Sequence, residues 1–216
     1  MKLNLKRLML SGLAASALLG SLSACAPLVV GSALMSGLVA IDRRTTGTQI
    51  EDEGIELRTA QGLRQNLSDA AHVNVTSYNR KVLLTGEVSS AAEKERAERL
   101  AKSQENVSAV VNDLAIEPAS SLTQRSKDAI TTGQIKALMV DAKDLQSYAF
   151  KVITERGIVY LMGRVTPREA QRATEIASSG GVSGVVKVVR VFDTITEEEL
   201  KRISAQPLSP QAQPKI

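Results

Sequence analysis

The feature that most constrains the fold is an internal repeat that covers most of the chain. Gly86 and Gly163 align at an offset of 77 residues, and apolar residues recur at matching positions around them. The matched pairs are Ile55 with Ile130 and Leu63 with Leu138 at an offset of 75, and Val75 with Val152, Val82 with Val159, Leu84 with Leu161 and Val88 with Val165 at 77. A repeat of this length builds one supersecondary unit per copy. We therefore expect two similar folded units, over residues 46–118 and 125–195.

Both units have the same order of expected elements: helix, strand, strand, helix, strand. Runs of β-branched residues with period-two alternation indicate the strands. In the first unit we expect a helix over 50–66, strands over 73–77 and 82–88, a helix over 90–102 and a strand over 107–116. In the second we expect a helix over 127–140, strands over 149–154 and 158–165, a helix over 167–178 and a strand over 185–191. Ser89 or Ser90, and Thr166, are suited to cap the second helix of each unit, and Pro167 suits a first helical position.

Turns and glycines support the strand assignment. Residues 78–80 and 155–157 each contain an Asn or Gly, which tolerates positive φ and predicts a β-hairpin. Gly86 and Gly163 lie inside a strand pattern, where a glycine marks a bulge or the close approach of another backbone. We expect a structural role for both glycines, with direct lipid contact as the alternative.

The first 25 residues predict an exported and lipidated chain. Basic residues precede an uncharged apolar run over 8–22, as in a secretory signal peptide. The run ends in Leu22-Ser23-Ala24-Cys25, which resembles the bacterial lipobox, whose Cys is acylated and becomes the N-terminus after cleavage. Cys25 is the only Cys, so it has no disulfide partner within the chain. We expect a signal peptide over 1–24 and acyl chains such as palmitate on Cys25; an ordinary signal peptide with an incidental Cys is the alternative.

The segments that flank the repeat suggest a tether and a tail. Ala26 stands where an Asp would resemble an inner-membrane retention signal, so the resemblance implies the outer membrane of a two-membrane bacterium, facing the periplasm. The apolar stretch over 27–41 is shorter than the roughly 20 residues of a spanning helix, and a polar linker follows it. We expect a lipidated tether over 25–45 and, because the C-terminus is rich in Pro and Gln, a disordered tail over 196–216.

With two copies of the repeat behind a lipobox, the chain resembles a known family, the outer-membrane lipoproteins with two BON domains (the division- and outer-membrane-stress-associated lipid-binding group). The second strand of each unit reads Val-x-Leu-x-Gly-x-Val, and Val-x-x-Val-Val precedes the last strand. Other similar segments are Gly47-Thr48-Gln49, Asn74-Val75-Thr76, Lys81-Val82-Leu83-Leu84, Leu161-Met162-Gly163 and Arg168-Glu169-Ala170. The resemblance implies an α+β fold whose helices pack on one face of a three-stranded mixed sheet. It also implies lipid binding and support of envelope integrity.

No pattern in the sequence assembles a catalytic or metal site. His72 is the only His, whereas a metal site needs three or four converging ligands, so we expect an exposed His at a strand start. The acidic residues 51–53 suit a helix start, and the glycines of 180–184 lack the spacing and Lys of a phosphate loop. Export and scarce aromatics argue against nucleic acid as a partner. We expect no enzyme, no catalytic residue, no metal and no cofactor.

Charge separates the two units and suggests where a lipid would bind. Residues 46–118 contain 8 Lys/Arg and 12 Asp/Glu, whereas 125–195 contain 11 and 7. Opposite net charges suggest different roles, although chance variation between two solvated surfaces gives the same counts. We therefore expect anionic phospholipid to bind the second unit, at its first helix.

The family attributes lipid contact to that helix and to the adjacent strand end. Carried over to this chain, the resemblance implies Ile130, Met139 and Arg164. Charge and helical spacing add Ile135, Lys136 and Arg168. Ala129 stands where the family often has an interface-seeking Trp, which predicts weaker insertion. The alternative for the apolar members is that they pack on their own sheet.

A different class of function also fits the sequence. The chain could be an adaptor for outer-membrane assembly or cell-division proteins, without direct lipid recognition. An exposed strand edge or the C-terminal tail would then carry the interaction. Flotation with vesicles distinguishes the two functions.

Overall fold

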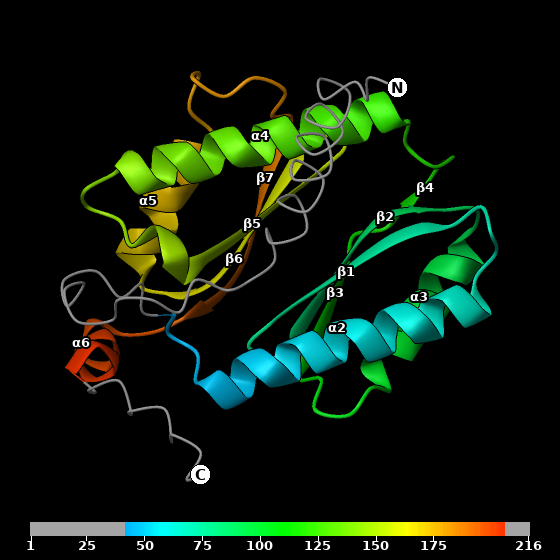
Figure 1. The fold of residues 1–216 in the computed structure, drawn as a ribbon, viewed down its shortest axis with the longest axis horizontal. Coiled ribbons are helices and arrows are strands. Elements are labelled where there is room, and N and C mark those ends of the chain that lie inside the picture. Colours follow the sequence, from blue (N-terminus) through cyan, green and yellow to red (C-terminus); the bar gives the residue numbers. More distant parts are fainter. Residues whose placement is uncertain (1–41, 206–216) are drawn as a thin grey trace, which may run out of the picture. The chain divides into compact units, whose positions relative to one another are not determined.

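The computed structural model describes residues 42–205, which contain two small α+β domains (Figure 1). The predicted signal peptide, Cys25, the apolar part of the tether and residues 206–216 lie outside the described residues. The first domain contains α2 (Thr46–Asn66), β1 (His72–Tyr78), β2 (Lys81–Val88), α3 (Ala91–Lys102), β3 (Ala109–Asn112) and β4 (Ala115–Ile116). The second contains α4 (Leu122–Asp141), a 3-10 turn (Ser147–Ala149), β5 (Phe150–Glu155), β6 (Ile158–Val165), α5 (Pro167–Ala177) and β7 (Lys187–Thr194), and α6 (Glu197–Ala205) follows it.

Each domain is built around one central strand. β2 pairs antiparallel with β1 and parallel with β3, and β6 pairs in the same way with β5 and β7. The predicted α+β fold with three-stranded mixed sheets is therefore confirmed. The one difference is that the last strand of the first domain is split into β3 and β4, which both pair with β2. Leu114 lies between the two pieces and leaves the ladder to enter the core.

The second helix of each domain starts as predicted, whereas α2 and α4 begin at Thr46 and Leu122, before their predicted starts at residues 50 and 127. The Ser90 hydroxyl accepts a hydrogen bond from the Glu93 backbone N–H at the start of α3. Thr166 and Glu169 form a reciprocal capping box at the start of α5, with Pro167 in its first turn. Each such cap contributes about 1 kcal/mol, which explains why these helix boundaries could be predicted closely.

A buried aspartate ties the first helix of each domain to the hairpin turn. Residues 79–80 and 156–157 all have positive φ, as a type I′ turn requires. Asp52 of α2 accepts hydrogen bonds from both backbone N–H groups of residues 79–80, each at 2.7 Å. Asp128 of α4 accepts from both N–H groups of residues 156–157, each at 2.9 Å. The expectation that Asp52 complements the dipole at a helix start was wrong, because α2 begins at Thr46 and has no acidic residue in its first turn; Asp52 binds the hairpin instead.

These aspartates correct the register of the repeat. The buried residues of α2 are Asp52, Ile55, Thr59 and Leu63. Those of α4 are Asp128, Thr131, Ile135 and Met139, each at an offset of 76. The predicted offset of 75 in the helices was therefore wrong by one residue. Ile130 and Leu138 correspond to Gly54 and Gly62, and they lie outside the core.

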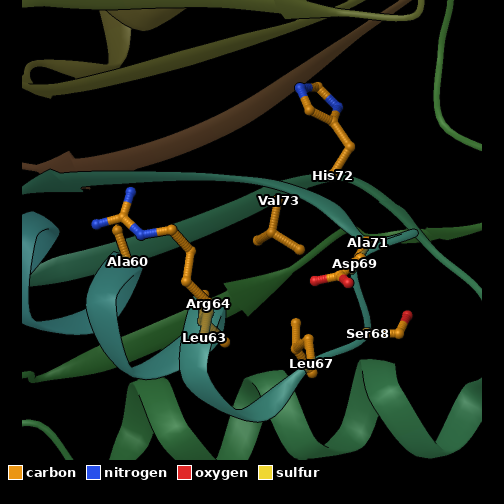
Figure 2. A pocket seen from close by; sticks show the side chains of 9 residues that line it. All are labelled: Ala60, Leu63, Arg64, Leu67, Ser68, Asp69, Ala71, His72 and Val73. Carbon is orange, nitrogen blue, oxygen red and sulfur yellow. The ribbon is translucent and has the colours of Figure 1, made fainter.

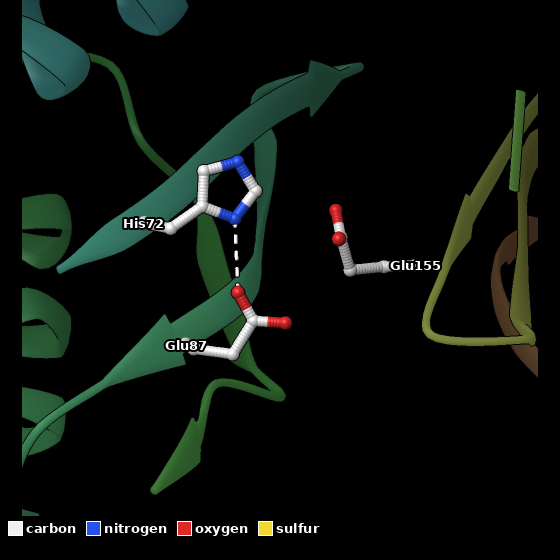
Figure 3. A group of neighbouring side chains, drawn as sticks. All are labelled: His72, Glu87 and Glu155. Carbon is white, nitrogen blue, oxygen red and sulfur yellow. Dashed lines mark hydrogen bonds and ion pairs between the residues drawn. The ribbon is translucent and has the colours of Figure 1, made fainter. Parts of the chain in front are cut away.

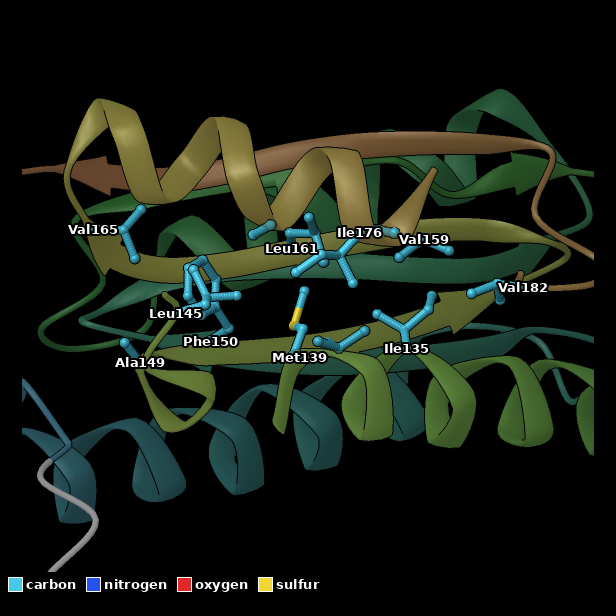
Figure 4. Packing of buried hydrophobic residues seen from close by; sticks show 13 residues of the cluster. Ile135, Met139, Leu145, Ala149, Phe150, Val159, Leu161, Val165, Ile176 and Val182 are labelled. Carbon is cyan, nitrogen blue, oxygen red and sulfur yellow. The ribbon is translucent and has the colours of Figure 1, made fainter. Parts of the chain in front are cut away.

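The core of the second domain lies between its sheet and its two helices. Figure 4 shows Ile135 and Met139 projecting from α4 toward Leu161 of the sheet. Both are fully enclosed, with exposed fractions of 0% and 1%. Burial of a side chain of this size contributes about 1.5–3 kcal/mol.

The sheet faces that the helices leave uncovered meet each other. Because strand side chains alternate in direction, Leu83 faces away from Val82 and Leu84, which lie in the core of the first domain. A second apolar cluster joins the two domains and contains Tyr78, Leu83, Tyr160, Met162 and Val191. Two ion pairs accompany it, from Lys151 Nζ to Glu56 Oε1 at 2.6 Å and from Lys81 Nζ to Asp193 Oδ1 at 2.5 Å. The two domains thus share an interface.

The last residues of the predicted tether are docked onto both domains. The Arg43 guanidinium donates to both carboxylate oxygens of Glu169, at 2.8 and 2.6 Å, and both side chains are buried. The Arg44 guanidinium lies 4.2 Å from the centre of the Tyr78 ring and pairs with Asp52 at 2.7 Å. The prediction of a simple polar linker is therefore wrong for these two residues, because each is held by a buried carboxylate.

The predicted disordered tail is also wrong in part. Residues Glu197–Ala205 form α6, which begins with three consecutive glutamates. Negative charge at a helix N-terminus complements the helix dipole, and the Thr196 hydroxyl accepts from the Glu199 N–H at 3.1 Å. Two of these glutamates also form ion pairs with the second domain, described below.

The two strand glycines allow another backbone to approach closely. A Cβ on Gly86, whose φ is 106°, would lie 2.1 Å from the carbonyl oxygen of His72. A Cβ on Gly163 would lie 2.5 Å from the carbonyl oxygen of Ala149. Any larger residue must displace the paired strand, so the geometry accounts for both glycines without a ligand.

Candidate functional site

The exposed face of α4 gathers apolar side chains that its own domain does not bury. Ile130 is 60% exposed, and Leu122, Leu138 and Val140 are exposed as well. Lys136 and Ala129 are exposed on the same helix. A Cβ on Gly133 would touch nothing within 4 Å, so this part of the helix surface is open. The face offers a surface of small and apolar groups with a cation at its edge.

Two predicted lipid contacts do not belong to this face. Ile135 and Met139 point into the core described above, so neither forms part of the exposed face. The physical reason is helical spacing: they lie four and eight residues after the buried Thr131, on the side that meets the sheet. Ile130 and Lys136 remain as candidates.

The equivalent positions of α2 have a different chemistry, although α2 also exposes the apolar residues Ile50 and Leu57. At the offset of 76, Ala129, Ile130 and Leu138 correspond to Glu53, Gly54 and Gly62. Val140 corresponds to Arg64. Both helices pack on their sheets in the same way, so the contrast between their exposed faces does not arise from the fold.

A shallow apolar groove continues this face at the C-terminal end of α4. It has a volume of about 250 Å³ and lies between the helix and the segment that leads into β5. Its lining residues are Lys136, Met139, Val140, Ser147, Tyr148 and Phe150. Tyr148 is partly exposed there. Within residues 42–205, no other aromatic side chain near the helix face exposes so much of its ring to solvent. The sequence analysis missed Tyr148, because it lies outside the helix.

The two predicted arginines are engaged by other charges. Arg164 forms an ion pair with Glu199 of α6. Arg168 lies 3.9 Å from Glu197, which also belongs to α6. The Arg168 side chain is more than half exposed, and that of Glu197 is nearly half exposed. Helix α6 therefore offsets part of the positive charge that the sequence assigned to lipid binding.

Some of the oppositely charged residues of the two domains form ion pairs with each other. Lys151 pairs with Glu56, and Arg156 Nη1 lies 3.1 Å from Glu117 Oε2. Both pairs join a basic residue of the second domain to an acidic residue of the first. The charge asymmetry thus has a structural component in addition to any role in binding.

The first domain has a pocket of its own, between the end of α2 and the start of β1 (Figure 2). Its volume is about 300 Å³, and its lining is mixed. The apolar residues Leu63, Leu67 and Val73 belong to or pack on the core, and Arg64 and Asp69 are polar residues of the lining. The lining thus combines residues of the core with polar ones, and it includes His72 at the start of β1.

Three ligand-type side chains meet at the edge of the first domain (Figure 3). His72 and Glu87 are paired across β1 and β2, and His72 Nδ1 lies 2.9 Å from Glu87 Oε2. Glu155, at the end of β5 in the second domain, completes the group. The side chain of His72 is only 22% exposed and that of Glu87 0%. The expectation of an exposed His at the strand start was therefore wrong, because His72 pairs with Glu87 of the neighbouring strand and Glu155 of the second domain lies beside it.

Burial raises the pKa of the Glu155 carboxyl above its ordinary value, and a hydrogen bond from Asn74 Nδ2 at 2.6 Å opposes the shift. The proximity of Glu87 adds to the increase. Two carboxyl groups and an imidazole thus share one small, largely enclosed volume.

Within residues 42–205, no helix is long and apolar enough to cross a membrane.

Comparison with known proteins agrees with this architecture. A family model of the BON domain matches residues 51–118 and again residues 127–195. The chain is 41% identical over 173 residues to the outer membrane lipoprotein DolP of Haemophilus influenzae, covering 79% of this chain and 89% of that protein. It is 35% identical over 157 residues to a 21 kDa hemolysin of Actinobacillus pleuropneumoniae, covering 72% and 80%. A solved structure of CdsD, a type III secretion protein of Chlamydia trachomatis, covers 74% of this chain and 99% of that chain, but its TM-score of 0.29 and identity of 11% support no conclusion.

Proposed function

This chain belongs to the BON-domain family, with two copies of the domain, and we propose that it is an outer-membrane lipoprotein whose second domain binds anionic phospholipid. In this proposal Cys25 carries the acyl chains and the folded domains face the periplasm. The lipobox-like motif and the similarity to a protein named outer membrane lipoprotein support the location. Contact between α4 and the bilayer would help to maintain envelope integrity.

The observation that carries the proposal is the exposed face of α4. Ile130, Leu138 and Val140 stand where α2 has Gly54, Gly62 and Arg64, although the two helices share one packing geometry. A folded domain gains nothing from exposing these side chains to water, whereas complete burial of such a side chain in a bilayer interface contributes at most about 1.5–3 kcal/mol. Lys136 adds about 1 kcal/mol on an anionic surface.

Vesicle flotation tests this proposal with residues 42–216, which retain Arg43 and Arg44 but omit Cys25. We expect co-flotation with vesicles of phosphatidylglycerol and phosphatidylethanolamine, and much less with phosphatidylcholine alone. Binding should fall as salt rises, because exposed charges are screened over about 8 Å at physiological ionic strength. Ile130→Ser and Lys136→Glu should each reduce binding several-fold.

Leu57→Ser is the matched control, because Leu57 is an apolar residue on α2 that is exposed to a similar extent. It should leave flotation unchanged. Ala129→Trp should strengthen binding, because Ala129 lies on the exposed face of α4 and a Trp prefers the membrane interface. Equal effects of Leu57→Ser and Ile130→Ser, or equal binding to neutral vesicles, would contradict lipid recognition by α4 and leave the adaptor function as the better explanation.

The anchor is tested separately in cells. Cys25→Ala should yield an uncleaved precursor that is absent from the outer-membrane fraction, because acylation precedes cleavage at a lipobox. Normal processing and membrane retention of this variant would contradict lipidation, whatever the vesicle assay shows.

A further inference from the structure

We propose that His72, Glu87 and Glu155 form a binding site for a divalent transition-metal ion, such as Zn²⁺, that joins the two domains. The three potential ligand atoms all lie within 4.8 Å of one another. His72 and Glu87 come from neighbouring strands of the first domain, whereas Glu155 comes from the hairpin of the second. A metal bound here would link elements that are about 80 residues apart in the sequence.

A buried atom without a hydrogen-bond partner gives independent support for a ligand. Glu87 Oε2 accepts from the Ser120 backbone N–H at 3.2 Å and lies 2.9 Å from His72 Nδ1. Glu87 Oε1 is buried and has no hydrogen-bond partner among the described residues. Buried polar atoms are nearly always paired, so an orphaned carboxylate oxygen inside a group of ligand-type residues indicates a missing partner. Figure 3 shows this second oxygen directed toward the side on which Glu155 lies.

The kind of partner follows from the charges and the donor types. Glu87 is fully enclosed and Glu155 is 6% exposed, so two ionised carboxylates here would repel each other in a low-dielectric site. A dication offsets both charges at once. Imidazole nitrogen favours Zn²⁺ and similar transition metals, whereas Ca²⁺ and Mg²⁺ prefer oxygen ligands alone.

The positions of the side chains fit such an ion after small rotations. Bonds of about 2.0–2.2 Å to a tetrahedral Zn²⁺ place neighbouring ligand atoms about 3.3 Å apart. Side-chain movements of about 1 Å would bring the three groups to this spacing. Three protein ligands leave the fourth position for water. Asn74 Nδ2, which donates to Glu155 Oε2, is placed to orient that ligand.

Titration calorimetry with Zn²⁺ tests the site on the full-length chain, purified in detergent without a polyhistidine tag and treated with a chelator. We expect one equivalent to bind, with Mg²⁺ and Ca²⁺ producing no comparable signal. Because His72 is the only His, its imidazole resonances in an NMR spectrum should shift on addition of Zn²⁺. Co²⁺ should give visible absorption bands that Zn²⁺ removes.

Glu155→Gln is the informative variant, because a glutamine oxygen can still accept the hydrogen bond from Asn74 and the domain interface should stay folded. We expect it to weaken Zn²⁺ binding at least about tenfold. Glu117→Gln is the matched control, since Glu117 is a nearby exposed acid outside the group, and it should bind as the unaltered chain does. Equal Zn²⁺ binding by the two variants would overturn the proposal. So would the absence of Zn²⁺ binding up to about 100 µM together with unshifted His72 resonances.

Discussion

The buried pair between Arg43 and Glu169 makes a strong prediction about stability. We expect Arg43→Met to lower the free energy of unfolding by about 3–5 kcal/mol, the usual cost of removing one partner from a buried ion pair. Arg43 is 4% exposed and Glu169 3% exposed, so solvent cannot replace the lost partner. Arg43 also donates to the backbone carbonyl oxygen of Arg164 at 2.9 Å and to Gln146 Oε1 at 3.0 Å. Met preserves most of the side-chain volume, so the loss reports on charge and hydrogen bonding.

The double variant tests the cause of that loss. Glu169→Gln alone should also destabilise, because it leaves the Arg43 charge uncompensated. Arg43→Met combined with Glu169→Gln should cost less than the two single changes together, with a coupling of about 1–3 kcal/mol. Thermal unfolding of the full chain in detergent, followed by circular dichroism, measures all three, and the single change at Arg43 should lower Tm by roughly 10 °C.

A matched control separates burial from charge. Arg58→Met removes the same side chain from an exposed pair with Glu51, where Arg58 is 44% exposed. Exposed pairs contribute about 0–1 kcal/mol. If Arg43→Met proved no more harmful than Arg58→Met, or if the double variant were strictly additive, the pair would not contribute as reasoned here.

Three further predictions concern stability. Gly86→Ala should destabilise by several kcal/mol in urea titration, because a Cβ cannot fit 2.1 Å from the His72 carbonyl oxygen, whereas Gly133→Ala on open helix surface should stabilise by about 0.5–1 kcal/mol. Ile135→Ala should cost about 2–5 kcal/mol by creating a cavity, and Ile130→Ser about 0.5 kcal/mol or less; similar losses for both would mean that Ile130 is buried after all. Burial raises the pKa of Glu169, but hydrogen bonds from Arg43 and Thr166 together lower it below its ordinary value of 4.5. A carboxyl with a depressed folded-state pKa stabilises above its unfolded pKa, so this contribution should be lost as the pH falls from about 4.5 through the folded-state pKa, and Glu169→Gln should flatten the dependence of Tm on pH in that range.

Much of the fold could be predicted because its signals are local. The hairpin turns need residues that accept positive φ, and the caps at Ser90 and Thr166 depend on side chains within three residues of the backbone groups that they satisfy. Strand alternation placed β6 over its observed bounds, Ile158–Val165. These features depend on a few neighbouring residues, so a single sequence reveals them.

The helix register was the main error in the repeat analysis. A shift of one residue rotates a helix by about 100°, which exchanged the core positions Thr131 and Met139 for the exposed positions Ile130 and Leu138. Apolar residues occur on both faces of α4, so their spacing alone could not decide between the two registers. The aspartates would have decided it, because Asp52 and Asp128 each bind the turn of their own hairpin and therefore align, at an offset of 76.

The His72 group and the docking of Arg43 could not be predicted from local patterns. His72 meets Glu155 only because two domains pack through their sheets, and Arg43 meets Glu169 across 126 residues of sequence. One signal was present: at the positions equivalent to His72 and Glu87, the second copy has Ala149 and Arg164. A His and a Glu that face each other in only one copy of a repeat suggest a role that the fold itself does not require.

The docking of Arg43 also bears on how strongly α4 needs to bind a membrane. The chain between Cys25 and Asp42 spans at most about 60 Å when fully extended, and Arg43 then holds its end on the second domain. If the chain is acylated, this contact would therefore confine the second domain itself to a thin layer beside the bilayer. The two domains would not move as loosely linked bodies. Such confinement corresponds to an effective lipid concentration in the millimolar range, at which even a millimolar affinity of the α4 face keeps it occupied about half of the time. Under the proposed function, the buried guanidinium would thus turn a distant acyl anchor into local avidity, and weak recognition by Ile130 and Lys136 would suffice.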